Sequence, residues 1–251
     1  NKKRMNRFWK FSFAFVAVIF FLSACKPKSK NGNITFQVKT KYGTQSFAIG
    51  TPNTDPQGRR IQIDRLNFYL SHIKLIKTDN SEIELKDVIL CNPANATSLT
   101  FITDNVNGDF KAIKFSCGVD SIQNLTDPLS VPSSNPLSSD NDMYWSMLKY
   151  RFEILEARCD TTTTGTGSFN WFPRYHIGGN TLYRTTTIAK SFSTCCETSY
   201  TLNLTLDVEK IFYGAQTLDI ITEADTQSGS SDNPVIAPKF VDNFSQAFSI
   251  E

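Results

Sequence analysis

The sequence contains two histidines, His72 and His176, and imidazole is both a common metal ligand and a common general base. His176 belongs to the segment Tyr175–Gly179, which ends in a pair of glycines. Glycine allows backbone angles and close approaches that other residues do not, so such a pair can aim one side chain. We therefore predict that a loop beside Trp171 and Phe172 presents His176. A lone histidine is more often a hydrogen-bonded structural residue than a metal ligand, and the sequence leaves both roles open for His176 at this point.

His72 lies in a segment of alternating apolar and polar residues, out of phase with Ile73 and Leu75. We expect it to face outward from a strand. Neither histidine has a partner at the spacing of a zinc-hydrolase motif, and the sequence lacks a Gly-x-Ser-x-Gly elbow and a phosphate-binding loop. The carboxylates are scattered without an evident acid–base pair. These observations predict a protein that is not an enzyme.

The first 24 residues have the organisation of a secretory signal. They carry five basic residues and no acidic one, and the apolar run Phe11–Leu22 follows. This run is too short to span about 30 Å of hydrocarbon as a permanent helix. Leu22–Cys25 resembles a lipobox, so residues 1–24 are predicted to be removed and Cys25 to be acylated. Residues 25–33 are polar and contain proline and glycine, which is typical of a flexible tether.

Removal of the signal changes the charge of the chain. The whole sequence has 26 basic and 24 acidic residues, and loss of the five basic ones leaves a slightly acidic domain. No basic stripe remains that would attract nucleic acid. We expect a protein of the cell envelope that contacts the bilayer through its acylated cysteine. Lys26 rather than aspartate follows that cysteine, which resembles lipoproteins sent to the outer membrane.

Five cysteines follow the anchor, and an oxidising compartment favours disulfides among them. They are Cys91, Cys117, Cys159, Cys195 and Cys196. We predict a Cys91–Cys117 bridge, because both residues lie on strand-like segments about one hairpin apart. Cys159 would then pair with Cys195 or Cys196. The alternative is that the adjacent Cys195 and Cys196 form a soft-metal or redox pair.

Alternation of period two predicts that residues 34–251 form one all-β domain, an antiparallel β-sandwich with long loops. The clearest strand is Leu202–Val208, and a longer, bulged strand is expected over Ile61–Leu75. Ile83–Leu85 and Val88–Leu90 suggest a short hairpin. Only two short segments are compatible with helical turns, namely Glu209–Tyr213 and Val241–Ala247. Long loops are expected at residues 50–59, 125–142, 159–174 and 222–238, and functional residues often lie in such loops.

Five segments, in this order, resemble successive blocks of the MbnP-like family. They are Phe68–Leu75, Lys114–Asn124, Asp142–Trp145, Tyr175–Gly179 and Phe240–Phe248. The family comprises exported copper-binding proteins named for methanobactin operons, with many lipoprotein members in Bacteroidetes. The resemblance implies a β-rich fold and one copper site, built from histidines and a tryptophan that a partner di-haem peroxidase oxidises to kynurenine.

Carried over by position, His176 matches the family's histidine before Gly-Gly, and Trp145 matches the first tryptophan of its block. Two departures concern the remaining ligands. Lysines stand on the strand Phe36–Tyr42 where many members have a histidine, and Met147 stands where a second tryptophan is common. Lysine is a poor replacement for a metal ligand at neutral pH because it is protonated. Copper(I) accepts two or three soft or imidazole ligands, so His72, Met147 or a thiolate could complete a site with His176.

The sequence therefore predicts a non-catalytic, lipid-anchored copper-binding or copper-handling protein with His176, Trp145 and His72 as candidate ligands. The alternative is a cell-surface interaction module that keeps the scaffold with a degenerate metal site. For Trp145, a role as a core aromatic side chain is the competing interpretation. For Asp120, the competing interpretation is a turn or a hydrogen-bonded carboxylate.

Overall fold

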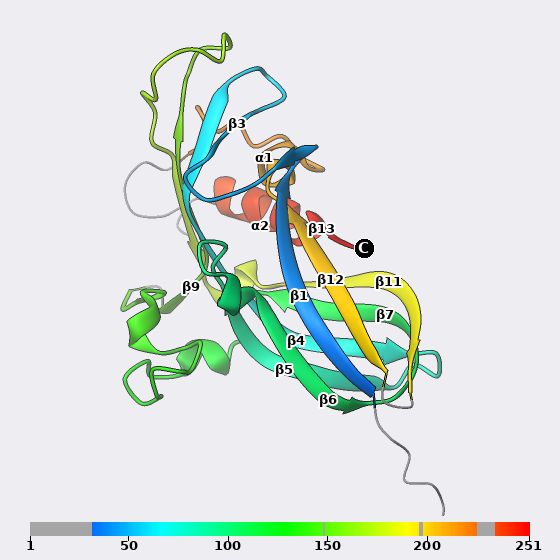
Figure 1. Ribbon diagram of the computed structural model, residues 1–251. Helices are drawn as coiled ribbons and strands as arrows, with labels where there is room; N and C mark the ends of the chain where they lie inside the picture. Colours follow the sequence, from blue (N-terminus) through cyan, green and yellow to red (C-terminus); the bar gives the residue numbers. More distant parts are fainter. Residues whose placement is uncertain (1–31, 148, 196–197, 225–233) are drawn as a thin grey trace, which may run out of the picture.

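The computed structural model describes residues 32–147, 149–195, 198–224 and 234–251. Two β-sheets pack against each other over a shared hydrophobic core, which confirms the predicted all-β sandwich (Figure 1). The proposed signal, the lipidated Cys25, most of the tether and Cys196 lie outside these described residues. Within the described part of the chain, no helix is long and apolar enough to cross a membrane.

The smaller sheet has five strands in the order β13-β12-β1-β2, with β6 also paired to β1. Its strands are β1 (Gly32–Tyr42), β2 (Gln45–Ser46), β6 (Thr100–Val106), β12 (Ser199–Asp207) and β13 (Phe248–Ile250). β1 and β12 run parallel from the pair Asn33 and Ser199 onward. This pairing differs from the predicted antiparallel pattern, because the two strands come from opposite ends of the domain and no hairpin joins them.

The larger sheet has eight strands, with β10-β9-β4-β7-β11 as its main path and β3, β5 and β8 paired at its margins. These strands are β3 (Pro52–Thr54), β4 (Arg60–Lys77), β5 (Glu82–Cys91), β7 (Gly108–Cys117), β8 (Tyr144–Trp145), β9 (Lys149–Cys159), β10 (Arg174–Gly178) and β11 (Arg184–Thr194). The α-helices are α1 (Glu209–Tyr213) and α2 (Ile236–Gln246). The 3-10 turns are η1 (Ala96–Leu99), η2 (Gln123–Leu125), η3 (Ser139–Asn141) and η4 (Asn180–Leu182).

The main core lies between the sheets and follows the alternation in the sequence. Leu202, Leu204 and Leu206 of β12 are fully buried, as their period of two predicts. α2 closes this core: the ring of Phe244 lies 5.3 Å from that of Phe68, in an edge-to-face arrangement. Both predicted helical segments are helical, and α2 begins five residues earlier than the apolar pattern indicated.

β4 is the long strand predicted from the sequence, and its pairing register shifts near His72. His72 has a positive φ of 48°, which places the irregularity in β4 itself. The hairpin predicted within residues 83–90 is wrong, because β5 is one continuous strand paired along β4. The polar residues Lys86 and Asp87 belong to the strand and are exposed, so their polarity reflects solvent contact and not a turn.

The predicted Cys91–Cys117 disulfide is absent, and the topology explains why. Leu70 of β4 pairs with Ile89 of β5 and with Cys117 of β7, so β4 lies between the strands that carry the two cysteines. Two strand spacings are about 9–10 Å, and a disulfide needs Cα atoms within about 7 Å. Cys91 and Cys117 are buried free thiols.

The predicted pairing of Cys159 with Cys195 or Cys196 is also not formed. Cys159 is a buried free thiol, whereas Cys195 is exposed. Cys159 ends β9, where it forms a bridge with Trp171 through main-chain hydrogen bonds. The loop between these two residues is therefore closed by backbone contacts.

A second, smaller core lies on the outer face of the larger sheet. The long loop after η2 folds back over this face and places Leu137 and Met143 against Tyr69, Tyr150 and other strand residues. The Tyr69 hydroxyl donates to the Pro136 carbonyl, and the Tyr150 hydroxyl donates to the Leu137 carbonyl. This loop was predicted as a candidate functional region, and it forms one wall of both pockets described below.

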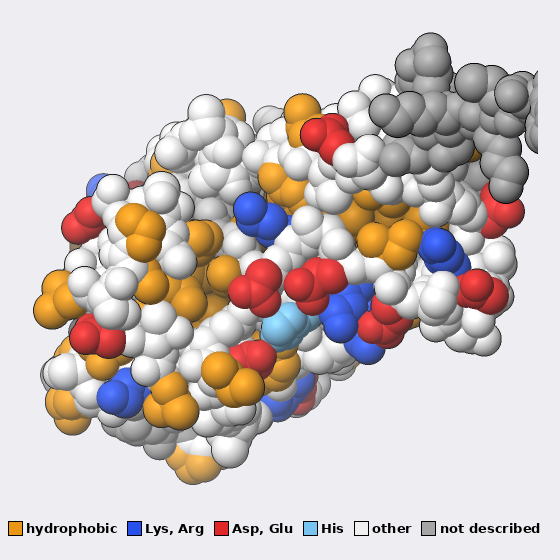
Figure 2. Space-filling model, turned by 90° about the horizontal axis from the view of Figure 1, so that it is seen from below, with side chains coloured by type: hydrophobic (Ala, Val, Ile, Leu, Met, Phe, Trp, Pro, Cys, Tyr) orange, Lys and Arg blue, Asp and Glu red, His pale blue; other side chains and the backbone are white. Residues whose placement is uncertain are grey.

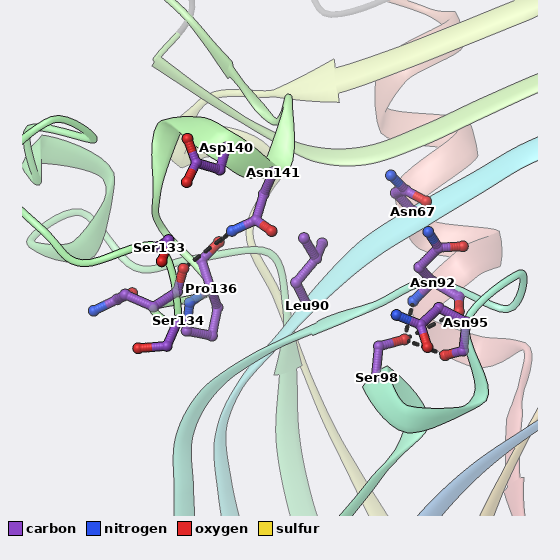
Figure 3. Close-up of a pocket in the computed structure, with 11 residues that line it drawn as sticks. Asn67, Leu90, Asn92, Asn95, Ser98, Ser133, Ser134, Pro136, Asp140 and Asn141 are labelled. Atoms are coloured by element: carbon purple, nitrogen blue, oxygen red, sulfur yellow. Dashed lines mark hydrogen bonds between the residues drawn. The ribbon is translucent and has the colours of Figure 1, made fainter.

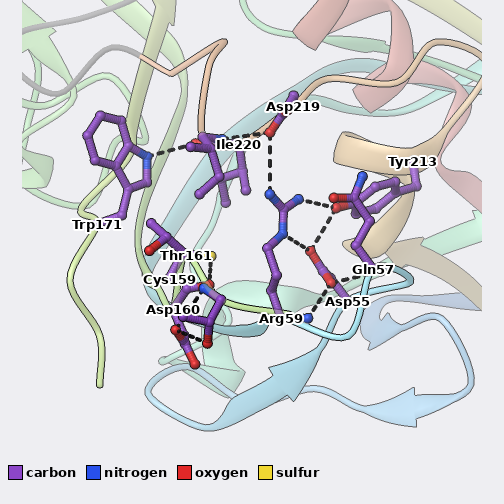
Figure 4. Close-up of polar contacts among 12 residues, drawn as sticks. Asp55, Gln57, Arg59, Cys159, Asp160, Thr161, Trp171, Tyr213, Asp219 and Ile220 are labelled. Atoms are coloured by element: carbon purple, nitrogen blue, oxygen red, sulfur yellow. Dashed lines mark hydrogen bonds and ion pairs between the residues drawn. The ribbon is translucent and has the colours of Figure 1, made fainter. Parts of the chain in front are cut away.

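A buried polar network joins the turn before β4 to α1 (Figure 4). The Arg59 guanidinium donates to the Asp55 carboxylate at 2.8 Å and to the Tyr213 hydroxyl at 2.7 Å, and it lies 3.4 Å from Asp219. Nearby, the Trp171 indole donates to the Ile220 carbonyl. The contacts of Arg59 tie the turn before β4 to α1. The indole hydrogen bond gives Trp171 a structural role.

Candidate functional site

Trp145 and His176, two of the three predicted metal ligands, line the same pocket. Its volume is about 330 Å³, and Asp142, Tyr144 and Arg151 complete its lining. Trp145 and His176 are each partly exposed, so both side chains are accessible from solvent. The structure therefore places Trp145 at a surface pocket, and the interpretation of it as a core aromatic is wrong.

β9 positions both side chains. Trp145 of β8 pairs with Lys149 of β9, and His176 of β10 pairs with Ile154 of β9. The two candidate ligands therefore lie on different strands that both pair with β9. Ile154 belongs to the outer core, and paired residues share a face, so His176 also lies on the outer face. The prediction that a loop presents His176 is wrong, because His176 lies within strand β10 and pairs with β9.

The Gly-Gly pair after His176 nevertheless has the predicted effect of allowing a close approach. A Cβ atom on Gly178 would lie 2.7 Å from the Tyr150 carbonyl oxygen, so only glycine fits against β9 there. Gly179 has a positive φ of 103° and turns the chain away from the sheet. Together they set the end of β10 against β9 and fix the position of His176 beside the pocket.

Charged groups surround the imidazole of His176. Its Nε2 atom is 2.8 Å from a carboxylate oxygen of Glu156. Arg65 lies 3.1 Å from Asp142 and 3.9 Å from Glu156, and Arg151 lies 3.2 Å from Asp142. Two carboxylates and two guanidiniums thus form a chain of alternating charges that begins at the imidazole, in the order Glu156, Arg65, Asp142 and Arg151, and their charges balance.

His72 lies outside this pocket, in a separate acidic cluster. Its Nε2 atom is 2.8 Å from Asp120, and its Nδ1 atom is 3.5 Å from Asp87 and 3.6 Å from Glu84. The side chain is about one-third exposed, as predicted for an outward-facing residue. Figure 2 shows acidic side chains beside a histidine on one face of the molecule.

Asp120 is the hydrogen-bonded turn carboxylate that the sequence suggested. One of its oxygens accepts the backbone N–H groups of Ile122 and Gln123. Desolvation raises the pKa of Asp120, but the hydrogen bonds from the Gln123 backbone and from His72 outweigh it, so the pKa lies below its ordinary value. Asp120 therefore stays ionised and holds His72 in place.

The other suggested donors do not reach the pocket. Met147 is largely exposed and is not among the lining residues. Lys41, on the early strand where the sequence resemblance implies a histidine, lies in the smaller sheet and pairs with Asp207. Burial raises the pKa of the Cys159 thiol to about 11, which disfavours the thiolate that binds metal.

The described residues contain no group of three or more histidine, cysteine, aspartate or glutamate side chains arranged to hold a metal ion. His176 is thus the single imidazole at the pocket. Glu156, Arg65 and Arg151 were not anticipated from the sequence. Their positions follow from the register between β4, β9 and β10, which a single sequence does not reveal.

These features define a two-sheet β-sandwich protein with a histidine–tryptophan pocket on the outer face of its larger sheet. The sequence profile of the MbnP family matches residues 31–232, and the chain belongs to that family. The solved structure of MbnP from Methylosinus trichosporium has a similar fold, with a TM-score of 0.58 and 14% sequence identity over 87% of this chain and 97% of that one. A search of curated proteins gives no match.

Proposed function

We propose that the protein binds copper at the pocket formed by Trp145 and His176 and acts in copper handling without catalysing a reaction. One observation carries this proposal: the two residues that the family resemblance assigns to copper are distant in sequence and line one pocket. The Trp145 and His176 side chains come from β8 and β10, which both pair with β9.

The environment of His176 fits a metal-binding imidazole. Metal-bound histidines usually place their second ring nitrogen against a carboxylate, which fixes the orientation of the ring. Glu156 contacts Nε2 of His176 in this way. Asp142 is the carboxylate that lines the same pocket. The donor set is small, and it suits a metal with few protein ligands, such as copper(I).

The test is a copper titration of the mature chain, residues 25–251, by equilibrium dialysis under reducing conditions. A background with Cys195→Ser and Cys196→Ser removes the vicinal cysteines as alternative thiolate ligands. We expect one copper per chain, and we expect His176→Ala to weaken binding at least tenfold because it removes the only imidazole at the pocket.

His72→Ala is the matched control, because it removes the only other histidine and lies outside the pocket. Its copper affinity should equal that of the parent chain. Absence of stoichiometric binding in the parent, or equal losses in both variants, would contradict the proposed site.

A second function is favoured by a separate observation. Lysines such as Lys41 stand on the early strand where the family resemblance implies a histidine ligand, which suits a scaffold that has lost its metal site. Such a protein would act as an interaction module at the cell surface. A chain that binds no copper but retains partners in a pull-down from intact cells would support this alternative over the first.

We further propose that the domain works at the outer membrane, anchored through acylated Cys25. The lipobox-like segment before Cys25 supports this location, and the described domain begins shortly after it. Cys25→Ser should move the protein from the membrane fraction to the soluble envelope fraction and leave the signal uncleaved by the lipoprotein peptidase. A Cys25→Ser protein that is still processed and membrane-bound would contradict the anchor.

The family resemblance also suggests a di-haem peroxidase as a partner. Trp145 is the residue such a partner would reach, because it is partly exposed at the pocket, whereas the Trp171 indole is bonded to the Ile220 carbonyl. Mass spectrometry of the chain isolated with its neighbouring gene products would show whether Trp145 alone carries the mass change of kynurenine, in which one oxygen is gained and one carbon is lost.

A further inference from the structure

A second pocket, of about 340 Å³, lies beside the outer core and has no part in the proposed copper site. One wall is the β5–η1 turn with Asn92, Asn95 and Ser98, and the other is the covering loop around Ser133–Asn141. Leu90 lies between the walls (Figure 3). We call this pocket the amide groove, because asparagines dominate its lining.

Asn67 of β4 is the observation that indicates a ligand. The residue is only 8% exposed, it lines the amide groove, and its side-chain amide has no hydrogen-bond partner among the described residues. Asn67 shares a register with Ile154 of the outer core, so its side chain lies on the outer face. The polar atoms of Asn67 are not among the fully buried, unpartnered atoms of the described residues, so its amide opens onto the groove, where water or a ligand can satisfy it.

Hydrogen bonds within the protein orient the other asparagine side chains of the groove. Each of these side chains keeps a donor or an acceptor that a ligand could contact. The Oδ1 atoms of Asn92, Asn95 and Asn135 accept nearby backbone N–H groups, so their amide N–H₂ groups are oriented as donors. Asn141 uses its amide nitrogen on the Asn135 and Pro136 carbonyls, which leaves its oxygen as an acceptor. The groove thus offers fixed donors and acceptors together.

The chemistry of the lining selects the ligand class. No lysine, arginine or histidine is among the lining residues, so the groove has no cation for a phosphate or carboxylate. Asp140 is the single carboxylate, which is too little negative charge for a dedicated divalent-cation site. The apolar surface is limited to Leu90 and Pro136, which is too small for a hydrophobic ligand.

We propose that the amide groove binds a neutral polyhydroxylated ligand, namely a sugar residue, free or within a glycan chain. Sugar hydroxyls both donate and accept, which matches the mixed set of amides, Ser133, Ser134 and Asp140. The apolar face of a sugar ring would pack on Leu90. The pocket volume falls at the lower end of the range for small-ligand sites.

The test is saturation-transfer NMR and titration on the mature chain. The probes are glucose, galactose, mannose and N-acetylglucosamine, together with β-1,4-linked tetramers of glucose and of N-acetylglucosamine. We expect at least one probe to bind. Binding of the tetramers alone would identify a glycan chain as the source, and binding of a monosaccharide would identify a free sugar. No signal from any probe would overturn the proposal.

Asn67→Leu should weaken that binding at least tenfold without lowering the melting temperature, because it removes an amide that has no protein partner. Asn203→Leu is the matched control, since Asn203 lies on β12 of the other sheet and also has an unpartnered side-chain oxygen. Its sugar binding should be unchanged. The exposed pair Ser133→Ala with Ser134→Ala, which does not affect the core, should weaken binding at least threefold. Unchanged binding in the Asn67 and serine variants would overturn the proposal.

Discussion

Glu153 of β9 is the least expected side chain in the core. It is fully buried, and neither carboxyl oxygen has a hydrogen-bond partner among the described residues. Desolvation raises the pKa of Glu153 well above its ordinary value, and the charge of Arg184 opposes this only in part. Burial therefore favours the protonated carboxyl group, and between the unfolded and the native pKa the folded state holds a proton that the unfolded chain releases.

This protonation predicts a pH-dependent stability. Above the unfolded pKa of about 4.3, the unfolded chain ionises while the native chain does not, so stability falls by about 1.4 kcal/mol per pH unit up to the native pKa. Glu153→Gln removes this loss. Urea unfolding should show little difference between variant and parent near pH 3.5 and a variant advantage of at least about 1 kcal/mol at pH 7. A difference that is constant with pH would contradict the assignment.

At the residue scale, the sequence predicted the roles of several side chains correctly and could not predict their surroundings. The outward position of His72 and the turn role of Asp120 followed from phase and local composition. The Glu156 partner of His176 did not, because it depends on how β9 and β10 are registered. The unpartnered amide of Asn67 also stayed hidden, since alternation places a polar residue there without showing what covers it.

The turn between β3 and β4 depends on the network around Arg59. The side chains of Arg59 and Asp55 are 5% and 1% exposed, so their ion pair is shielded from water. Arg59→Met would leave the Asp55 charge buried without its partner, which costs about 3–5 kcal/mol. Urea unfolding should show this loss.

The double variant Arg59→Met with Asp55→Asn is the control for that prediction. It removes the buried charge along with its partner, so it should recover a substantial part of the lost stability. Equal destabilisation by the single and double variants would mean that packing, and not charge, dominates the effect of Arg59.

At the element scale, alternation located most long strands, because a strand with one face in the core must repeat every two residues. β4 and β12 lie where the pattern placed them. The pattern failed for β5, where two exposed polar residues resembled a turn, and for β10, where glycines resembled a loop. The alternation does not show which strands pair with each other. The predicted Cys91–Cys117 bridge was wrong for this reason, because β4 lies between β5 and β7.

In the molecule as a whole, the core that stabilises the fold and the candidate binding sites lie in different places. The main core between the sheets holds the sandwich together, while both pockets open on the outer face of the larger sheet, beside the covering loop. α2 and β13 lie beyond the matched family segment and still seal the main core through Phe244 and Phe248. Family membership was anticipated from ordered sequence blocks, and the fold follows from that membership.

The most direct test of the copper proposal uses Trp145 as its own reporter. In the mature chain, Trp171→Phe leaves Trp145 as the only tryptophan, because Trp9 belongs to the proposed signal. Copper bound beside Trp145 should quench its fluorescence, with saturation at one equivalent in the parent and in His72→Ala, and His176→Ala should abolish the saturable phase. Fluorescence that does not change at one equivalent of copper, or quenching that His176→Ala leaves intact, would contradict a copper site in this pocket.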